Sequence, residues 1–256
     1  MKRLAPLVLL PLLFVAGTAS AALNRESLDQ LALKVWKVRS AFHTYTVMQG
    51  DATYGERLEE VIAEADDLVA SLNESAQAGD DQAFVEMVTD SWERYRGFAE
   101  GNTVADLGYT EHYTILDLEN EALGLSQLIN QQRAGEADKA SSLADLAVRL
   151  QRITSEYMFT ASSPDGGSGA IGTGAEEGRL EFVRAVPDFD ERLKAAQKAW
   201  ADNPDVTREL RSVASKWAFI RESLVKFYEN SVPFVVQRYS EQMVESINNA
   251  AAIARQ

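Results

Sequence analysis

The sequence predicts an all-α protein made of two tandem antiparallel four-helix bundles, about eight helices in all, that follow a cleaved signal peptide. Apolar residues recur with the period of an α-helix along most of the chain, and the alternating pattern of β-strands is absent. Short breaks rich in Gly, Pro, Asn and Asp divide the helical pattern into eight segments. A series of helices joined by short connections favours antiparallel neighbours in a bundle.

The chain opens with the features of a secretory signal peptide. Two cations in the first three residues precede an apolar run from Leu7 to Ala16, and the small residues Thr18–Ala21 follow as a cleavage site. The apolar run is too short for a good membrane span. We therefore expect residues 1–21 to be removed and the mature protein to be exported, periplasmic or secreted in a bacterium, and not embedded in the membrane.

Four helices are expected in the first half, residues 24–133. The first begins with a capping-box sequence at Ser27–Gln30 and continues to about Met48, before Gly50 interrupts the pattern. The other three each have one apolar face, and the last of them is loosened at Gly108. These three cover about residues 54–75, 81–100 and 105–132.

Four more helices are expected in the second half, residues 137–256, beyond a boundary at residues 134–136. The first two cover about residues 138–160 and 179–201, separated by the Gly- and Ser-rich loop 162–178. Pro187 is expected to kink or split the second of them. The last two start at Pro204 and Pro233, because proline is favoured at the first position of a helix.

The two halves match each other along the chain. The leading helix segments Leu31–His43 and Leu146–Met158 align at an offset of 115 residues, and Trp92 aligns with Trp217 at an offset of 125. This match predicts an internal duplication in which each copy is one bundle. The alternative is that any two amphipathic four-helix stretches align this well.

Composition excludes several classes of function. The chain has 25 Lys and Arg against 39 Asp and Glu, a formal net charge of −14, which argues against nucleic acid and anionic lipid as partners. It has no cysteine, so disulfides, covalently attached haem and thiol chemistry are excluded.

No catalytic, metal or cofactor motif is predicted. The two histidines, His43 and His112, lack the Glu three residues earlier that a di-metal bundle site requires, and no Ser/His/Asp arrangement is present. The G-x-G-x-x-G string at Gly167–Gly172 follows a helix and not a strand, which argues against a dinucleotide site. We expect no enzyme activity, no metal and no cofactor.

A pair of cations lies beside the buried face of each leading helix. The pairs are Lys34 with Lys37 and Arg149 with Arg152. If the halves pack through these helices, we expect the four cations to meet at the seam and bind a small anion, since the planar Arg fork suits planar oxyanions. The alternative is local pairing, as between Arg152 and Glu156 four residues later.

The segment Gln151–Met158, QRITSEYM, resembles the Q-R-M-L-S-Q-R-M signature of the PilJ-type sensor domain. That domain occurs in the type IV pilus methyl-accepting chemotaxis transducer and is similar to the periplasmic domain of NarX-type nitrate/nitrite sensor kinases. The helix around Trp217 and the segment Val235–Ala250 look like the family's W…L…S…M-N ending. The resemblance covers most of the second half and, more faintly, the first.

The resemblance implies that the first Arg of the signature binds an anion at a dimer seam. That Arg is Arg152 here, its counterpart in the first half is Lys37, and Ser155 matches the signature's serine. The chain departs from the pattern at Arg149, where the family has a small Gly, and at Tyr157, where it has a second Arg. Unlike the receptors, the chain has no methylation helices and no kinase.

The predicted function is therefore an exported, non-enzymatic sensory or ligand-binding protein. Its expected ligand is a small anion, nitrate, nitrite or a carboxylate, and its expected partner is a membrane receptor or a pilus-associated protein. The predicted ligand-binding residues are Arg152, Lys37, Arg149, Lys34 and Ser155. The alternative is an envelope or pilus-associated interaction protein that uses an exposed helix face and needs no small ligand.

Overall fold

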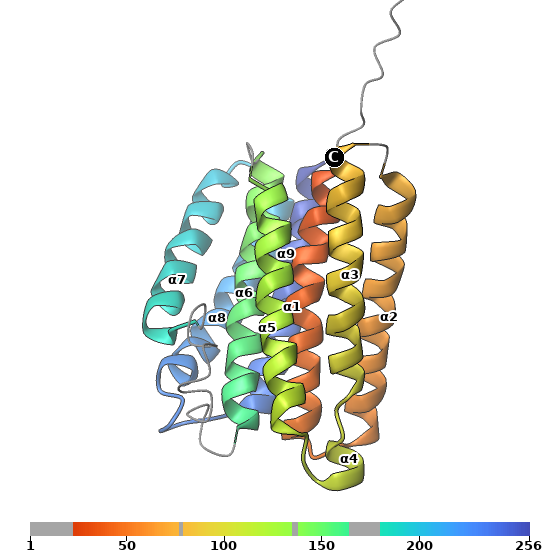
Figure 1. The fold of residues 1–256 in the computed structure, drawn as a ribbon. Coiled ribbons are helices and arrows are strands. Elements are labelled where there is room, and N and C mark those ends of the chain that lie inside the picture. The colour runs from red at the N-terminus through yellow and green to blue at the C-terminus, as the bar shows by residue number, and fades with distance from the viewer. Residues whose placement is uncertain (1–22, 77–78, 135–137, 164–179) are drawn as a thin grey trace, which may run out of the picture.

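The computed structural model describes residues 23–76, 79–134, 138–163 and 180–256, and within these ranges it contains helices and turns but no strand (Figure 1). The predicted all-α fold is confirmed. The predicted signal peptide, the boundary between the halves and most of the Gly-rich loop lie outside the described residues. The helices are α1 (Arg25–Val47), α2 (Ala52–Ser75), α3 (Asp80–Glu100), α4 (Val104–Leu107), α5 (His112–Gln132), α6 (Lys139–Ser162), α7 (Phe182–Ala199), α8 (Pro204–Val225) and α9 (Pro233–Ala254).

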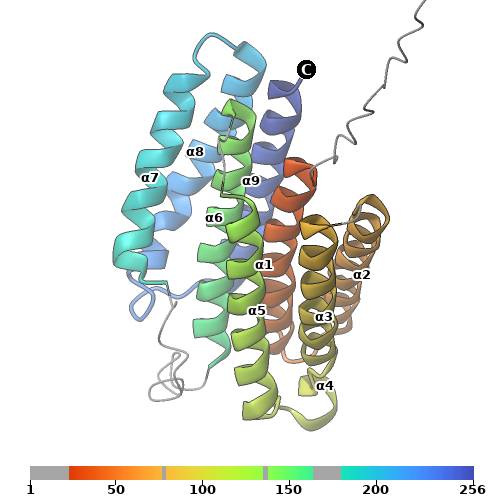
Figure 2. The same ribbon diagram turned by 45° about the horizontal axis from the view of Figure 1, so that its top comes forward.

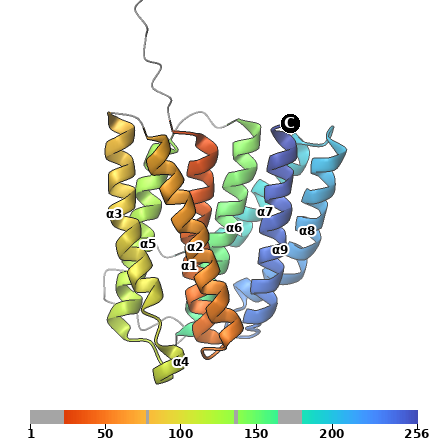
Figure 3. The same ribbon diagram turned by 90° about the vertical axis from the view of Figure 1, so that its right-hand side faces the viewer.

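The long helices form two four-helix groups that lie side by side (Figure 2). α1, α2, α3 and α5 enclose one hydrophobic core, and α6, α7, α8 and α9 enclose the other. Within each group neighbouring helices run up and down, as short connections require. α1 and α6 pack against each other at the centre and run in the same direction (Figure 3).

The cores are filled by large side chains and meet at the contact between α1 and α6. Phe42 and Tyr95 are completely buried in the first core, and Phe189 is completely buried in the second. Leu33 of α1 belongs to the second core, and Val148 of α6 packs against both. The two bundles therefore share apolar packing.

The aligned tryptophans occupy equivalent positions in the two bundles. Trp92 donates from Nε1 to Asp66 at 2.7 Å, and Trp217 donates from Nε1 to Asp190 at 2.6 Å. In each bundle the tryptophan lies on the third long helix and the aspartate on the second. The two bundles therefore repeat one buried ring whose polar end is satisfied by a carboxylate.

Three details of the helix boundaries differ from the expectation. α1 is capped by Asn24, whose side chain accepts from the Glu26 amide at 3.0 Å, so the helix begins before the predicted cap at Ser27. Gly108 adopts a left-handed conformation and separates α4 from α5. α7 is not split at Pro187 and continues to Ala199, with Val186 and Phe189 on either side of the proline packed in the second core.

Candidate functional site

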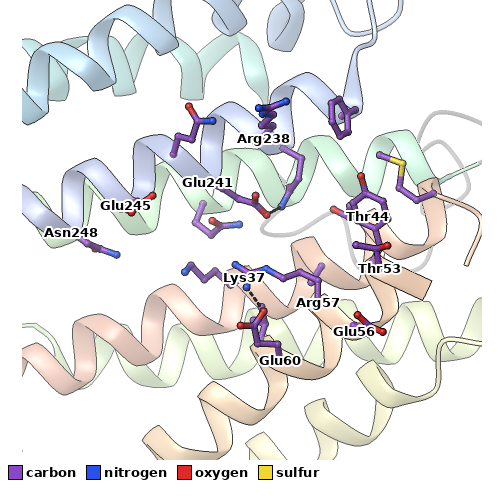
Figure 4. A pocket seen from close by; sticks show the side chains of 18 of the residues that line it. Lys37, Thr44, Thr53, Glu56, Arg57, Glu60, Arg238, Glu241, Glu245 and Asn248 are labelled. Carbon is purple, nitrogen blue, oxygen red and sulfur yellow. Dashed lines mark hydrogen bonds and ion pairs between the residues drawn. The ribbon is translucent and has the colours of Figure 1, made fainter. Parts of the chain in front are cut away.

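A groove of about 940 Å³ lies between the two bundles (Figure 4). Its volume is in the range of about 300–1,000 Å³ that is usual for ligand pockets. The residues that line it come from α1, α2 and α9, from one position of α6 and from the chain beside Val47, the last residue of α1. A ligand in this groove would therefore touch both bundles at once.

The helical period places the polar residues on the two walls. On α9, Arg238, Glu241 and Glu245 follow each other at intervals of three and four residues and face the groove. On α2, Arg57 and Glu60 do the same and form an ion pair with each other. The other lining residues are Lys37, Ala41, Thr44, Met48, Thr53, Tyr54, Glu56, Val61, Gln151, Phe234, Gln237, Gln242, Asn248 and Asn249.

Lys37 is the predicted binding residue that faces the groove. The neighbouring cations are paired, Lys34 with Glu64 and Arg57 with Glu60. Among the described residues, none is a hydrogen-bond or ion-pair partner of the Lys37 ammonium. Burial, followed by the charge of Lys34, lowers the pKa of Lys37. The charges of Glu64 and Glu241 act in the opposite sense, but neither carboxylate forms an ion pair or hydrogen bond with the Lys37 ammonium.

The expectation that the four flank cations meet is wrong. Lys37 lines the groove, whereas Arg149 and Arg152 line a separate pocket of about 290 Å³ between α5, α6 and α7. The reason is geometric. α1 and α6 are parallel and equivalent by a rotation about the direction of their axes, so matching flanks of the two helices face opposite sides of the molecule.

The smaller pocket satisfies most of its charges internally. Arg149 pairs with Asp188 of α7 at 2.9 Å, a pair between two helices and not the local pairing within one helix. Arg133 is held by Asp29 and Asp145. The Arg152 guanidinium lies 5.1 Å from the Trp36 ring centroid, an arrangement typical of a cation–π contact. Burial lowers the pKa of Arg152. Two of the three arginines of this pocket, Arg133 and Arg149, are thus already paired with carboxylates of the protein.

Ser155, the fifth predicted residue, lies at the seam but is completely buried. Its hydroxyl accepts from Arg39 Nη1 at 2.9 Å. Arg39 also donates from Nε to Glu119 at 2.8 Å and from Nη2 to Glu156 at 3.1 Å. His43 Nε2 lies 2.9 Å from Glu119, which completes a cluster drawn from α1, α5 and α6.

The charges of this seam cluster stabilise one another. Burial by itself would raise the pKa of Glu119, but the charge of Arg39 and the hydrogen bond from His43 lower it to about 2. Burial lowers the pKa of His43, and the carboxylates of Glu119 and Glu156 raise the pKa of Arg39 against the effect of burial. Arg39 is only 3% exposed, so the cluster joins helices and does not present a ligand site.

The sequence contained one signal for this cluster. Arg39 lies four residues after Val35 and three before Phe42, so it belongs to the apolar stripe of α1 and not to its flank. A cation at such a position must find a buried partner. The local pattern around Arg39 does not reveal that its partner is Glu119, because Glu119 lies on α5, about 80 residues along the chain.

Comparison of the chain with protein-family models, with curated proteins and with solved structures gives no match. Within the described ranges, no helix has the length and apolar character needed to cross a membrane. The same ranges contain no cluster of three or more metal-ligating side chains.

Proposed function

We propose that the chain is an exported, non-enzymatic ligand-binding protein of the sensory kind, and that the groove between its bundles binds a solute through a carboxylate. The observation that supports this is Lys37, a half-buried cation in a groove of about 940 Å³ with no carboxylate partner among the described residues. Burial disfavours its charged form, and a bound carboxylate would compensate through a charge-assisted hydrogen bond.

Binding suits this groove better than catalysis does. Among the described residues that line it there is no histidine, and most of the polar side chains are amides, carboxylates or the cations of Lys and Arg. Such groups recognise charge and hydrogen-bonding pattern. The proposal agrees with the resemblance of Gln151–Met158 to the sensor-domain signature.

A sensory role would follow from where the groove lies. Its walls, α2 and α9, belong to different bundles, so a ligand that touches both would favour one relative arrangement of the bundles over others. A membrane receptor or a pilus-associated partner could read that arrangement. Binding without such a change would leave a simple solute-binding protein.

The test is isothermal titration calorimetry of the mature protein with acetate, succinate, nitrate and nitrite. Lys37→Gln should weaken carboxylate binding about tenfold to hundredfold, since a hydrogen bond to a charged group contributes about 1.5–3 kcal/mol. Lys216→Gln is the matched control, because Lys216 on α8 is also half-buried and lies outside the groove lining.

Two results would contradict the proposal. One is the absence of heat with every anion, and the other is an equal loss of binding in the two lysine variants. A nitrate signal that disappears in Arg152→Ala and persists in Lys37→Gln would transfer the site to the smaller pocket.

A second candidate function is protein contact through one end of the molecule, the end that carries α4 and the α8–α9 connection (Figure 1). Large apolar side chains are exposed on the elements that reach this end, and exposed apolar surface is typical of interaction sites. They are Leu107, Tyr109, Tyr113, Val225, Tyr228 and Phe234. Replacement of Tyr113 and Tyr228 by Ser should abolish partner co-purification if this candidate is right and leave it unchanged if not.

A further inference from the structure

We infer that the groove takes a short peptide with free amino and carboxyl ends, and not a lone inorganic anion. This inference rests on the proposed function, since it names the class of ligand for the same site. It depends on three features of the groove: the amide side chains that line it, the balance of charges on its walls, and its length.

The amide is that of Gln151 on α6. Gln151 is 2% exposed and lines the groove, and no hydrogen bond joins its side chain to another of the described residues. A carboxamide has two N–H donors and one carbonyl acceptor, so it can pair with a polar group that enters the groove. An amide group of a bound ligand would supply both a donor and an acceptor, as a peptide backbone does.

More amides line the same groove. Gln242, Asn248 and Asn249 follow along α9, so the wall offers donors and acceptors at several levels. This repetition suits a ligand with several amide groups, whereas a ligand of three or four atoms would contact only one level of the wall. Gln237 is already engaged, because it accepts from Ser40 at 3.0 Å and donates to Glu241 at 2.8 Å.

The charges of the walls are mixed. Lys37, Arg57 and Arg238 contribute three positive charges, and four glutamates contribute four negative ones: Glu56, Glu60, Glu241 and Glu245. A simple anion near Lys37 would also meet these carboxylates. A ligand that also carries an ammonium group would place that group at Glu245, one turn farther along α9 than the Glu241 whose charge acts on Lys37, and its carboxylate at Lys37.

The length of the groove fits several residues. Phe234 and Asn248 both line it and are 14 residues apart on α9, a separation of about 21 Å at about 1.5 Å per residue. An extended chain covers that distance with about six residues at about 3.3–3.6 Å each. Met48, Tyr54 and Phe234 line the end of the groove where α1 finishes, and they would accept an apolar side chain.

The experiment compares an Ala-Gly-Ala-Gly-Ala peptide with its N-acetylated form, its C-terminal amide and acetate in one calorimetric series. The free peptide should bind at least about tenfold more tightly than acetate, and blocking either end should weaken binding about tenfold, the effect of one charge-assisted hydrogen bond. Gln151→Met should weaken the peptide by about the same factor and leave acetate unchanged. Asn73→Ala, outside the groove lining, is the control.

The outcomes separate the two proposals. If acetate binds as tightly as the peptide, or if blocked and free peptides bind equally, the peptide inference is overturned and the proposed function stands. If no probe binds, both fail. Should Gln151→Met unfold, as thermal denaturation would reveal, Glu245→Gln gives the same decision: it should abolish the preference for the free over the N-acetylated peptide.

Discussion

Arg39 joins three helices from two bundles through one guanidinium. Its fork reaches Glu119 on α5, and Ser155 and Glu156 on α6. Breaking a buried ion pair is strongly destabilising because it leaves an uncompensated charge. The contact between the bundles thus depends on a residue that the flank pattern of α1 does not include.

Arg39→Met is expected to lower the free energy of unfolding by about 3–5 kcal/mol, because it leaves two buried carboxylates without their cation. Urea denaturation followed by circular dichroism measures the loss. Arg221→Met is the control, since the half-exposed pair of Arg221 with Asp190 contributes at most about 1 kcal/mol. Equal losses in both variants would contradict a special role for Arg39.

Acidification is expected to reduce stability in two stages. The folded-state pKa of His43 lies below its ordinary value of 6.5, so the unfolded chain binds the proton first and stability falls as the pH drops below about 6.5. The folded-state pKa of Glu119 is about 2 against an ordinary 4.5, so a second loss follows as the pH falls from about 4.5 toward 2.

Urea midpoints at pH 7.5, 5.5 and 4 measure both stages. His43→Gln should remove the first stage and keep the second, whereas His112→Gln, at the start of α5, should keep both. The groups that face His43 are Glu119, Arg39 and Glu156, and they are unchanged in either variant. A first stage that persists in His43→Gln would assign it to another group.

At the scale of the elements, two glycines at φ +77° have different surroundings. A Cβ at Gly50, between α1 and α2, would lie 2.6 Å from Cα of Ala105 in α4. A Cβ at Gly108, between α4 and α5, would meet nothing within 4 Å. The turn after α1 therefore packs directly against the backbone of α4, and a side chain larger than that of glycine does not fit between them.

Gly108→Ala is expected to cost about 1–2 kcal/mol, the penalty of the left-handed conformation alone. Gly50→Ala carries the same penalty, and the backbone of Ala105 must also move, which adds about 1–3 kcal/mol as overpacking does. Thermal denaturation of the pair measures the difference. If the two variants unfold at the same temperature, the contact at Gly50 has no energetic weight.

At the scale of the whole molecule, the contact between α1 and α6 makes the two bundles interdependent. Leu33 of the first bundle fills the second core, Val148 packs against both, and the seam cluster adds buried charges. Separation of the bundles would expose these apolar and charged groups to water together. The bundles should therefore unfold as one cooperative unit.

Leu33→Asp is expected to destabilise the second bundle although the residue belongs to α1. Leu33 is 2% exposed, and a charge there would be buried without a partner. Hydrogen exchange of the amides of α3 and α8 measures the effect, which should be a loss of protection in both bundles. Leu107→Asp, at an exposed site of α4, should leave protection unchanged. Loss confined to one of the two helices would show that the bundles unfold separately.

The sequence by itself determined the helices, their approximate ends and their division into two bundles. Apolar periodicity and helix-breaking residues are local properties, and they are enough to locate a segment such as α6 or a break such as Gly108. The prediction from sequence was wrong in detail where two residues near each other could both cap a helix. Asn24 and not Ser27 caps α1, because packing extends the helix beyond the predicted start.

Only the tertiary structure decided where each side chain of a helix flank points. Lys37 and Arg152 match in sequence, yet they line different pockets because two parallel, rotationally equivalent helices turn matching flanks to opposite sides. The partners of Arg39 and the groove around Gln151 are likewise set by helices far apart in the chain. The local sequence pattern indicates the period of a helix. It does not indicate how that helix is rotated about its axis relative to its neighbours, because packing between distant segments determines that rotation.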